Sequence, residues 1–174
     1  MGASGSVVTE RPQLLVVDGY NLLHADDTYR ALARRDLEAA RRRLVDDVSV
    51  FAAGRFEAVV VFDGGGPDPG APAGVRVEFS GHGEADTIVE ALAFQSRDEG
   101  RPCVVVTSDR ATRDAVLGRG VDVISSAKML EHLDESAEEW RESSGKAHRV
   151  TIAERLDPET RARLEERARG RGEG

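Results

Sequence analysis

The segment LLVVDGYN, residues 14–21, contains the pattern that indicates the fold class of this chain most directly. Its short, continuous apolar run, Leu14–Val17, is typical of a parallel strand that is buried on both faces, and Asp18 follows it directly. The same order of apolar run and aspartate recurs in AVVVFDGGG, residues 58–66, and in VVVTSD, residues 104–109. Strands that each deliver an aspartate at their carboxyl end indicate an α/β sheet with acidic side chains along one edge.

The spacing of apolar residues predicts the remaining elements. Helices are expected over Arg30–Ala53, Glu84–Arg97, Arg110–Leu117 and Ala127–Leu133, and further strands over Ala58–Phe62, Val75–Phe79, Val104–Thr107 and Val121–Ile124. The first of these helices is preceded by a turn, and the Val75–Phe79 strand is expected at an edge of the sheet because apolar and charged residues alternate in it. The order of elements predicts a three-layer α/β/α fold with an open, mostly parallel sheet of about five strands.

Composition limits the class of protein. A chain of 174 residues is long enough for one domain with a real core and some additional tail. The net charge of −8 argues against a generally basic nucleic-acid coat, although local patches can still attract RNA. No apolar run approaches the length of a membrane span, and no signal peptide is visible, so a cytoplasmic protein is expected. The single cysteine, Cys103, is expected to be a buried structural thiol.

Three segments are expected along the chain. Residues 1–12 are small and polar and predict a disordered leader, residues 13–133 contain the α/β domain, and residues 134–174 form a charged C-terminal extension. The extension is expected to end in a helix, with Asp157 as its N-cap and Pro158 at its first position. That helix is either a solvated appendage or a docking helix for a partner, and the sequence leaves the oligomeric state open.

Four aspartates lie where predicted strands end or predicted helices begin: Asp18, Asp63, Asp86 and Asp109. Each has an ordinary explanation as a turn former or a helix cap. Two carboxylates about 4 Å apart repel each other by roughly 4 kcal/mol at an effective dielectric constant of about 20. A fold that gathers several of them therefore needs protons or a cation, and Mg²⁺ or Mn²⁺ is the usual ion for a site made of oxygen atoms. The recurrence at strand ends favours an acidic metal site.

The motifs VVDGYNLLH, VVVFDGGG, GHGEADTIVEAL and VVVTSDRATRDAV, in this order and spacing, resemble the NYN domains of the PIN-like nuclease superfamily. The bacterial YacP-like group is the most similar, and the resemblance covers roughly residues 13–133. It implies a PIN-like fold, dependence on Mg²⁺ or Mn²⁺, and hydrolysis of single-stranded RNA that leaves 5′-phosphate and 3′-hydroxyl ends. Some YacP-like members are ribosome-associated mRNA endonucleases, so the resemblance makes mRNA and the ribosome the expected partners.

The resemblance also assigns roles to residues. Asp18 would be the central metal ligand and Asn21 its neighbour, whose side-chain amide is expected to donate to the Asp18 carboxylate. Asp86 and Asp109 would be further ligands, and Asp63 would bind the metal directly or through another group. The chain departs from the family in the glycine- and proline-rich loop after Asp63, where relatives usually have a more charged segment. That departure puts the substrate contacts of this loop in doubt.

Arginines near the acidic edge are expected to hold the RNA backbone, because an acidic edge without a cation repels RNA. The candidates are Arg30, Arg34 and Arg35 on the first helix, and Arg110 and Arg113 beside Asp109. Tyr20 is a candidate for stacking on a base. The run Arg41–Arg43 is expected to be solvated, because these residues circle the helix.

One alternative to a nuclease is a catalytically inactive module that binds RNA or the ribosome. A dehalogenase-type phosphatase is disfavoured, because Tyr20 stands where that chemistry needs a second aspartate. A receiver domain is disfavoured as well, because the pair of acidic residues that it requires after the first strand is absent.

Overall fold

The computed structural model describes the backbone of residues 11–155 and the side chains of residues 11–144. The chain divides into two compact units, Met1–Ser136 and Ala137–Gly174. Most of the predicted leader and the whole helix predicted after Asp157 lie outside the described residues. In the described part of the chain, no helix is long and apolar enough to cross a membrane.

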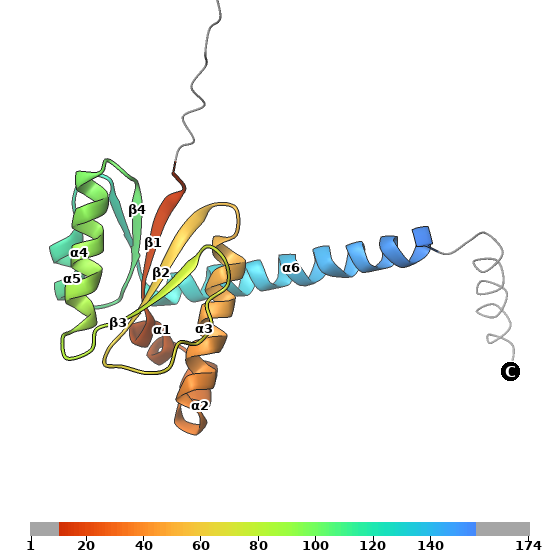
Figure 1. The fold of residues 1–174 in the computed structure, drawn as a ribbon, viewed down its shortest axis with the longest axis horizontal. Helices are drawn as coiled ribbons and strands as arrows, with labels where there is room; N and C mark the ends of the chain where they lie inside the picture. Colours follow the sequence, from red (N-terminus) through yellow and green to blue (C-terminus); the bar gives the residue numbers. More distant parts are fainter. Residues whose placement is uncertain (1–10, 156–174) are drawn as a thin grey trace, which may run out of the picture. The chain divides into compact units, whose positions relative to one another are not determined.

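Within the described residues, five strands form one sheet in the order β3-β2-β1-β4-β5 (Figure 1). The strands are β1 Gln13–Asp18, β2 Phe56–Phe62, β3 Val75–Phe79, β4 Cys103–Val106 and β5 Val121–Ile124. Every neighbouring pair is parallel, and β3 lies at an edge as predicted. The predicted three-layer α/β fold is confirmed. Strand order reverses between β1 and β4, which is where open parallel sheets bind their ligands.

Helices pack on both faces of this sheet. They are α1 Gly19–Ala25, α2 Asp27–Arg35, α3 Leu37–Ala52, α4 Ala85–Asp98, α5 Arg110–Val116 and α6 Ser126–Arg155. Residues of β1 alternate between the two faces, so Leu15 and Val17 join one buried cluster and Leu14 and Val16 join the other. The first cluster includes residues of α1, α3 and the start of α6, whereas the second includes residues of α4 and α5. Figure 1 shows α4 and α5 on one side of the sheet and α3 on the other.

The single helix predicted over Arg30–Ala53 is wrong, because three helices occupy residues 19–52. Each of the three begins after an aspartate whose Oδ1 accepts a hydrogen bond from a backbone N–H. Asp18 accepts from Asn21 at 3.2 Å, Asp26 from Tyr29 at 2.9 Å, and Asp36 from Ala39 at 2.9 Å. A capping carboxylate satisfies an otherwise unpaired N–H and ends the preceding helix. The expected turn after Asp18 is therefore the short helix α1.

The helix predicted over Ala127–Leu133 is too short, because α6 continues to Arg155 and enters the second unit. The residues of α6 after Leu133 are mostly polar, so they carry little apolar period, but they are mostly good helix formers without proline. The domain boundary expected after residue 133 stays a proposal. Cys103 is fully buried, and burial raises the pKa of its thiol to about 11.

Candidate active site

Asp18 is the last residue of the central strand β1, and it lies at the carboxyl edge of the sheet. It pairs in register with Val61 of β2, and the preceding Val17 pairs with Val106 of β4. The residue is only 7% exposed. One carboxylate oxygen caps α1 through the backbone N–H of Asn21. Asp18 is therefore an almost buried carboxylate at the point where the strand order reverses.

The pKa of the Asp18 carboxyl is higher in the folded protein than its ordinary value in water. Burial raises the pKa of Asp18 to about 6, and the negative charges of Asp86 and Asp63 act in the same direction. Hydrogen bonds from the Asn21 N–H and the Thr107 hydroxyl partly oppose this shift. Among the described residues, no salt bridge joins Asp18, Asp63 or Asp86 to a basic side chain. These three carboxylates therefore have no paired cation among the described residues.

Asp63 and Asp86 are brought together by the start of α4. Asp63 follows β2, and its Oδ1 accepts a hydrogen bond of 2.6 Å from the backbone N–H of Ala85, the first residue of α4. Glu84, at the N-cap position itself, makes no capping hydrogen bond with its side chain. An aspartate from a distant part of the chain thus supplies the cap, and Asp86 lies in the same first turn. Asp63 is exposed and Asp86 is partly buried.

Asn21 does not contact Asp18 in the expected way, because its backbone N–H makes the hydrogen bond instead of its side-chain amide. The side-chain Oδ1 of Asn21 accepts from the Ser108 N–H at 2.9 Å and from the Ser126 hydroxyl at 2.6 Å. Asn21 therefore fastens α1 to the turn after β4 and to the beginning of α6. The contribution of Asn21 to the site is to hold these three segments together.

Asp109 caps α5. Its Oδ1 accepts from the backbone N–H of Thr112 at 2.8 Å and from the Thr112 hydroxyl at 2.9 Å. These hydrogen bonds lower the pKa of Asp109, in contrast to Asp18. The charges that raise the pKa of Asp18 come from Asp86 and Asp63, whereas Asp109 caps a helix.

The acidic edge is not an assembled metal centre. In the residues that the structure describes, no group of three or more histidine, cysteine, aspartate or glutamate side chains is placed so that it could hold a metal ion. The donors at this edge are nevertheless carboxylate oxygens, which suit a hard cation. Mg²⁺ keeps several waters and needs only one or two carboxylates, so the chemistry of Asp18 and its neighbours fits Mg²⁺ or Mn²⁺.

The expectation that Arg41–Arg43 are solvated is wrong for Arg41, which is only 6% exposed. Its guanidinium carbon lies 5.4 Å from the ring centre of Tyr20, 5.5 Å from that of Phe62 and 5.2 Å from that of Phe79. The spacing of apolar residues along α3 is the sequence signal that could have predicted the burial of Arg41. Position 41 shares one stripe with the buried residues Leu44, Val45 and Val48, and such a stripe marks the buried face of a helix.

The residues predicted to bind RNA occupy separate helices. Arg30 pairs with Asp27 on α2, and Arg34 and Arg35 are exposed in the last turn of the same helix. Arg110 and Arg113 on α5 each lie 3.8 Å from a carboxylate oxygen of Asp114. Such exposed ion pairs are weak, so phosphate groups can replace them. The ring of Tyr20 is half-buried, edge-on to Phe62 at 5.4 Å and stacked on His24 at 6.1 Å.

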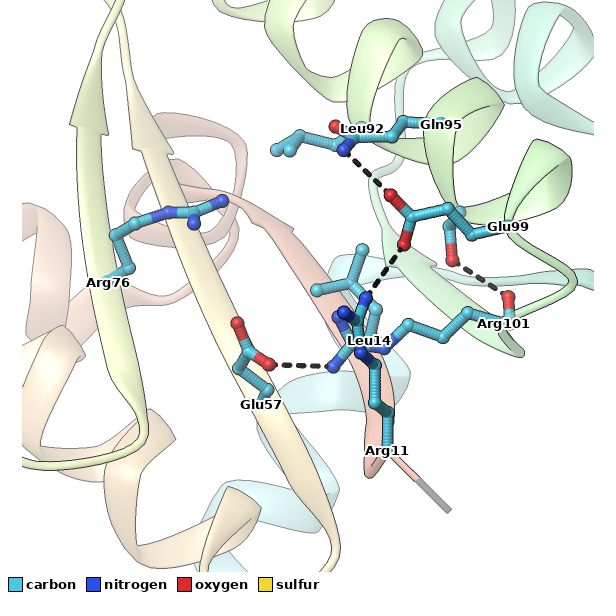
Figure 2. A pocket seen from close by; sticks show the side chains of 9 residues that line it. Arg11, Leu14, Glu57, Arg76, Leu92, Gln95, Glu99 and Arg101 are labelled. Atoms are coloured by element: carbon cyan, nitrogen blue, oxygen red, sulfur yellow. Dashed lines mark hydrogen bonds and ion pairs between the residues drawn. The ribbon is translucent and has the colours of Figure 1, made fainter. Parts of the chain in front are cut away.

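A pocket of about 380 Å³ lies near the amino ends of the strands, away from the carboxyl edge that contains Asp18 (Figure 2). Glutamates hold two of the arginines that line it: Arg11 contacts Glu99 at 3.3 Å and Arg101 contacts Glu57 at 2.9 Å. The pocket therefore contains paired charges of both signs, unlike the acidic edge.

Comparisons with known proteins agree with this description. A family model described as the YacP-like NYN domain matches residues 15–169. The crystal structure of Rae1 (YacP) from Bacillus subtilis is 25% identical, with a TM-score of 0.67, and the match covers 91% of this chain and 95% of that chain. A tryptophan-to-leucine mutant of the same protein is 26% identical, with a TM-score of 0.66, and the match covers 85% and 89% of the two chains. Among curated proteins, none matches the chain.

Proposed function

The chain belongs to the YacP-like NYN domain family, a family of nucleases, and on this premise we propose that it is a metal-dependent endonuclease that hydrolyses single-stranded RNA. One observation carries the proposal. The carboxylate of Asp18 is almost buried at the reversal point of the sheet, next to the charges of Asp86 and Asp63, and without a basic partner in the described residues. A divalent cation would remove this repulsion.

The proposal assigns the metal to the carboxylates of the acidic edge. Asp18 and Asp86 would be its principal ligands and Asp109 a further ligand. Asp63, which follows β2 and caps α4, would bind the metal directly or through another group. When bound, a divalent ion lowers the pKa of a coordinated water and neutralises charge that develops on the phosphodiester. Asn21 keeps the turn after β4 close to Asp18, through the hydrogen bonds that it accepts from Ser108 and Ser126.

In this proposal, RNA binding depends on the bound metal ion and on arginine side chains. The chain has a net charge of −8, so a metal-free acidic edge repels phosphate. The proposed contacts to the RNA backbone are Arg30, Arg34, Arg110 and Arg113, with Tyr20 stacking on a base. We further propose mRNA as the substrate, cleaved on the ribosome in the cytoplasm, because this is the activity that the family resemblance implies.

The first test replaces each principal ligand. In Asp18→Asn and Asp86→Asn variants, cleavage of a 5′-labelled single-stranded RNA with Mn²⁺ should fall by more than the roughly 10–100-fold typical of residues that only surround a metal. Asp122→Asn is the matched control, because Asp122 is an exposed residue of β5 outside the acidic edge. Products should have 5′-phosphate and 3′-hydroxyl ends. Undiminished cleavage by both site variants would show that the site is assigned wrongly.

A second test separates the two roles of Asp109. Asp109→Asn keeps an oxygen that can cap α5 but removes the charge, whereas Asp109→Ala removes both. If Asp109 is a metal ligand, the Asn variant loses cleavage while its urea unfolding midpoint stays near that of the wild type. If Asp109 only caps the helix, the Asn variant cleaves normally and the Ala variant alone is destabilised.

The alternative function is a catalytically inactive module that binds RNA or the ribosome. It is favoured by one observation: the described residues contain no group of three ligands ready to hold a metal. In that case the wild-type protein retains RNA on a filter or sediments with ribosomes, and RNA stays intact in the presence of Mg²⁺ and Mn²⁺.

A further inference from the structure

The side chain of Arg41, in the first half of α3, is enclosed by three aromatic rings. Tyr20 comes from α1, Phe62 is the last residue of β2, and Phe79 is the last residue of β3. Each ring centre lies between 5.2 and 5.5 Å from the guanidinium carbon, within the range in which a cation is attracted to an aromatic ring. One guanidinium therefore fixes the relative positions of segments that meet at the carboxyl edge of the sheet.

Hydrogen bonds connect Arg41 to the chain segments that follow Asp18 and Asp63. Nη2 of Arg41 donates to the Tyr20 hydroxyl and, at 3.3 Å, to the carbonyl of Gly65. Gly66 passes so close that a Cβ at this position would lie 2.3 Å from Nη1 of Arg41. The Gly64–Gly66 segment follows Asp63 directly, and Tyr20 is separated from Asp18 by a single glycine. Arg41 thus holds the neighbours of two proposed metal-binding carboxylates.

The charge of Arg41 is not neutralised by a carboxylate. Among the described residues no salt bridge involves Arg41, whereas Nε of Arg43 on the same helix lies 3.0 Å from Asp47. Nε of Arg41 is also buried without a hydrogen-bond partner. A hydrocarbon side chain would fill this space without the cost of burying an unpaired charge, so packing alone does not account for an arginine here.

We propose that Arg41 is a positioning residue for RNA. It holds the Tyr20 ring and the Gly64–Gly66 segment beside Asp18 and Asp63, so that the ring and the exposed glycine backbone face the substrate in a fixed arrangement. Its charge also makes this side of the acidic edge less repulsive to phosphate. The RNA part of the inference rests on the proposed function, whereas the order that Arg41 imposes on the loop does not.

Three variants test the proposal. Arg41→Lys keeps the charge but loses the planar fork that reaches Tyr20 and Gly65 together, and Arg41→Gln loses both. Arg42→Gln is the matched control, because it removes the same charge from an exposed neighbour on the same helix. Two quantities are measured for each variant and the wild type: amide hydrogen exchange of residues 62–66 and 19–21, and the steady-state kinetics of cleavage of one 5′-labelled single-stranded RNA with Mn²⁺.

In both Arg41 variants, amide exchange of these two segments should become faster. The KM for RNA should rise by roughly tenfold in Arg41→Gln and by less in Arg41→Lys, with kcat within about twofold of the wild type, because only substrate positioning is lost. Arg42→Gln should match the wild type in exchange. Unchanged exchange in the Arg41 variants would overturn the proposal, and so would a fall in kcat at constant KM.

The same experiment distinguishes this inference from the proposed function. If the wild-type protein cleaves no RNA with Mg²⁺ or Mn²⁺, the nuclease proposal fails. The hydrogen exchange and the Kd for the same RNA then decide the role of Arg41: a weaker Kd together with faster exchange supports it, and an unchanged Kd overturns it. If the wild type cleaves RNA but the KM and the hydrogen exchange are unchanged in the Arg41 variants, the inference about Arg41 is overturned and the nuclease proposal stands.

Discussion

At the scale of single residues, the chemistry of the site is concentrated in the carboxylate of Asp18. It is 7% exposed, and burial together with the neighbouring charges of Asp86 and Asp63 raises its pKa from 3.8 to about 6. A carboxylate in this environment resists ionisation, and a divalent cation reverses the preference because it stabilises the charged form. Binding of the metal by Asp18 should therefore weaken as the pH falls below about 6.

The raised pKa predicts that Asp18→Asn stabilises the protein in the absence of metal. The folded state holds the Asp18 proton more tightly than the unfolded state, so the wild type loses stability as the pH rises from about 4 through 6, and it stays penalised above that range. The rise in the pKa of Asp18 from 3.8 to about 6 corresponds to at most about 3 kcal/mol at pH 8. Urea unfolding in a chelator should show this gain for Asp18→Asn at pH 8 and little gain at pH 4.

Metal should reverse the order of the two proteins. Excess Mn²⁺ should stabilise the wild type, by about 4.1 kcal/mol at a free concentration one thousand times Kd, and should leave Asp18→Asn almost unaffected. Asp122→Asn serves as the exposed control in both media. If Asp18→Asn is less stable than the wild type at pH 8 in chelator, burial of the carboxylate does not destabilise the wild type as argued.

At the scale of elements, the turn from β1 into α1 depends on close packing between neighbouring segments. Gly19 begins α1, directly after Asp18, where the chain passes against the end of β2. A Cβ at Gly19 would lie 2.4 Å and 2.6 Å from ring atoms of Phe62 and 2.9 Å from the carbonyl oxygen of Val61. The absence of a side chain here is what lets the helix begin immediately after the strand and its aspartate.

Gly19→Ala should therefore destabilise the protein by about 1–3 kcal/mol, the usual cost of overpacking a dense interior. The matched control is Gly65→Ala, because nothing lies within 4 Å of a Cβ at Gly65. The control should be neutral or slightly stabilising, since alanine restricts the unfolded chain. Urea unfolding at neutral pH measures both variants, and equal midpoints for the two would show that the β1–α1 turn can relax around an added methyl group.

At the scale of the whole molecule, α6 links two compact units, Met1–Ser136 and Ala137–Gly174. Its first three turns, residues 126–136, belong to the first unit, where Met129 is fully buried and Leu133 is 4% exposed. Ser126, at its first position, is bound to Asn21 next to the acidic edge. The beginning of α6 is therefore part of the structure that carries the candidate site, and the proposed domain must extend at least this far.

Truncation tests that proposal. A chain ending at Ser136 should unfold cooperatively in urea and keep its metal-dependent cleavage of RNA in solution. A chain ending at Ser125 loses Met129 and Leu133 from the core. Burial of each such side chain contributes about 1.5–3 kcal/mol, a large part of the total stability of a domain. The shorter chain should therefore be largely unfolded. If the chain that ends at Ser136 does not fold, the first unit requires residues after Ser136.

The local sequence determined the fold and the family, because both depend on patterns that neighbouring residues form. Apolar runs at Leu14–Val17, Ala58–Phe62 and Val104–Thr107 correspond to buried parallel strands, and the aspartates after them fall at one edge of the sheet. The motifs around these aspartates indicated the family that the comparisons confirm. Helix boundaries were predicted less well, since the caps at Asp26 and Asp36 interrupt an otherwise continuous apolar period.

The roles of the polar groups around these aspartates became visible in the folded protein. Asp63 caps α4 across a long loop, Asn21 binds Ser108 and Ser126, and Arg41 is buried among three aromatic rings. The physical reason is that apolar burial follows a short period along the chain and can be read locally. The partner of a charge or hydrogen bond is chosen by packing between distant segments, which no short stretch of sequence contains.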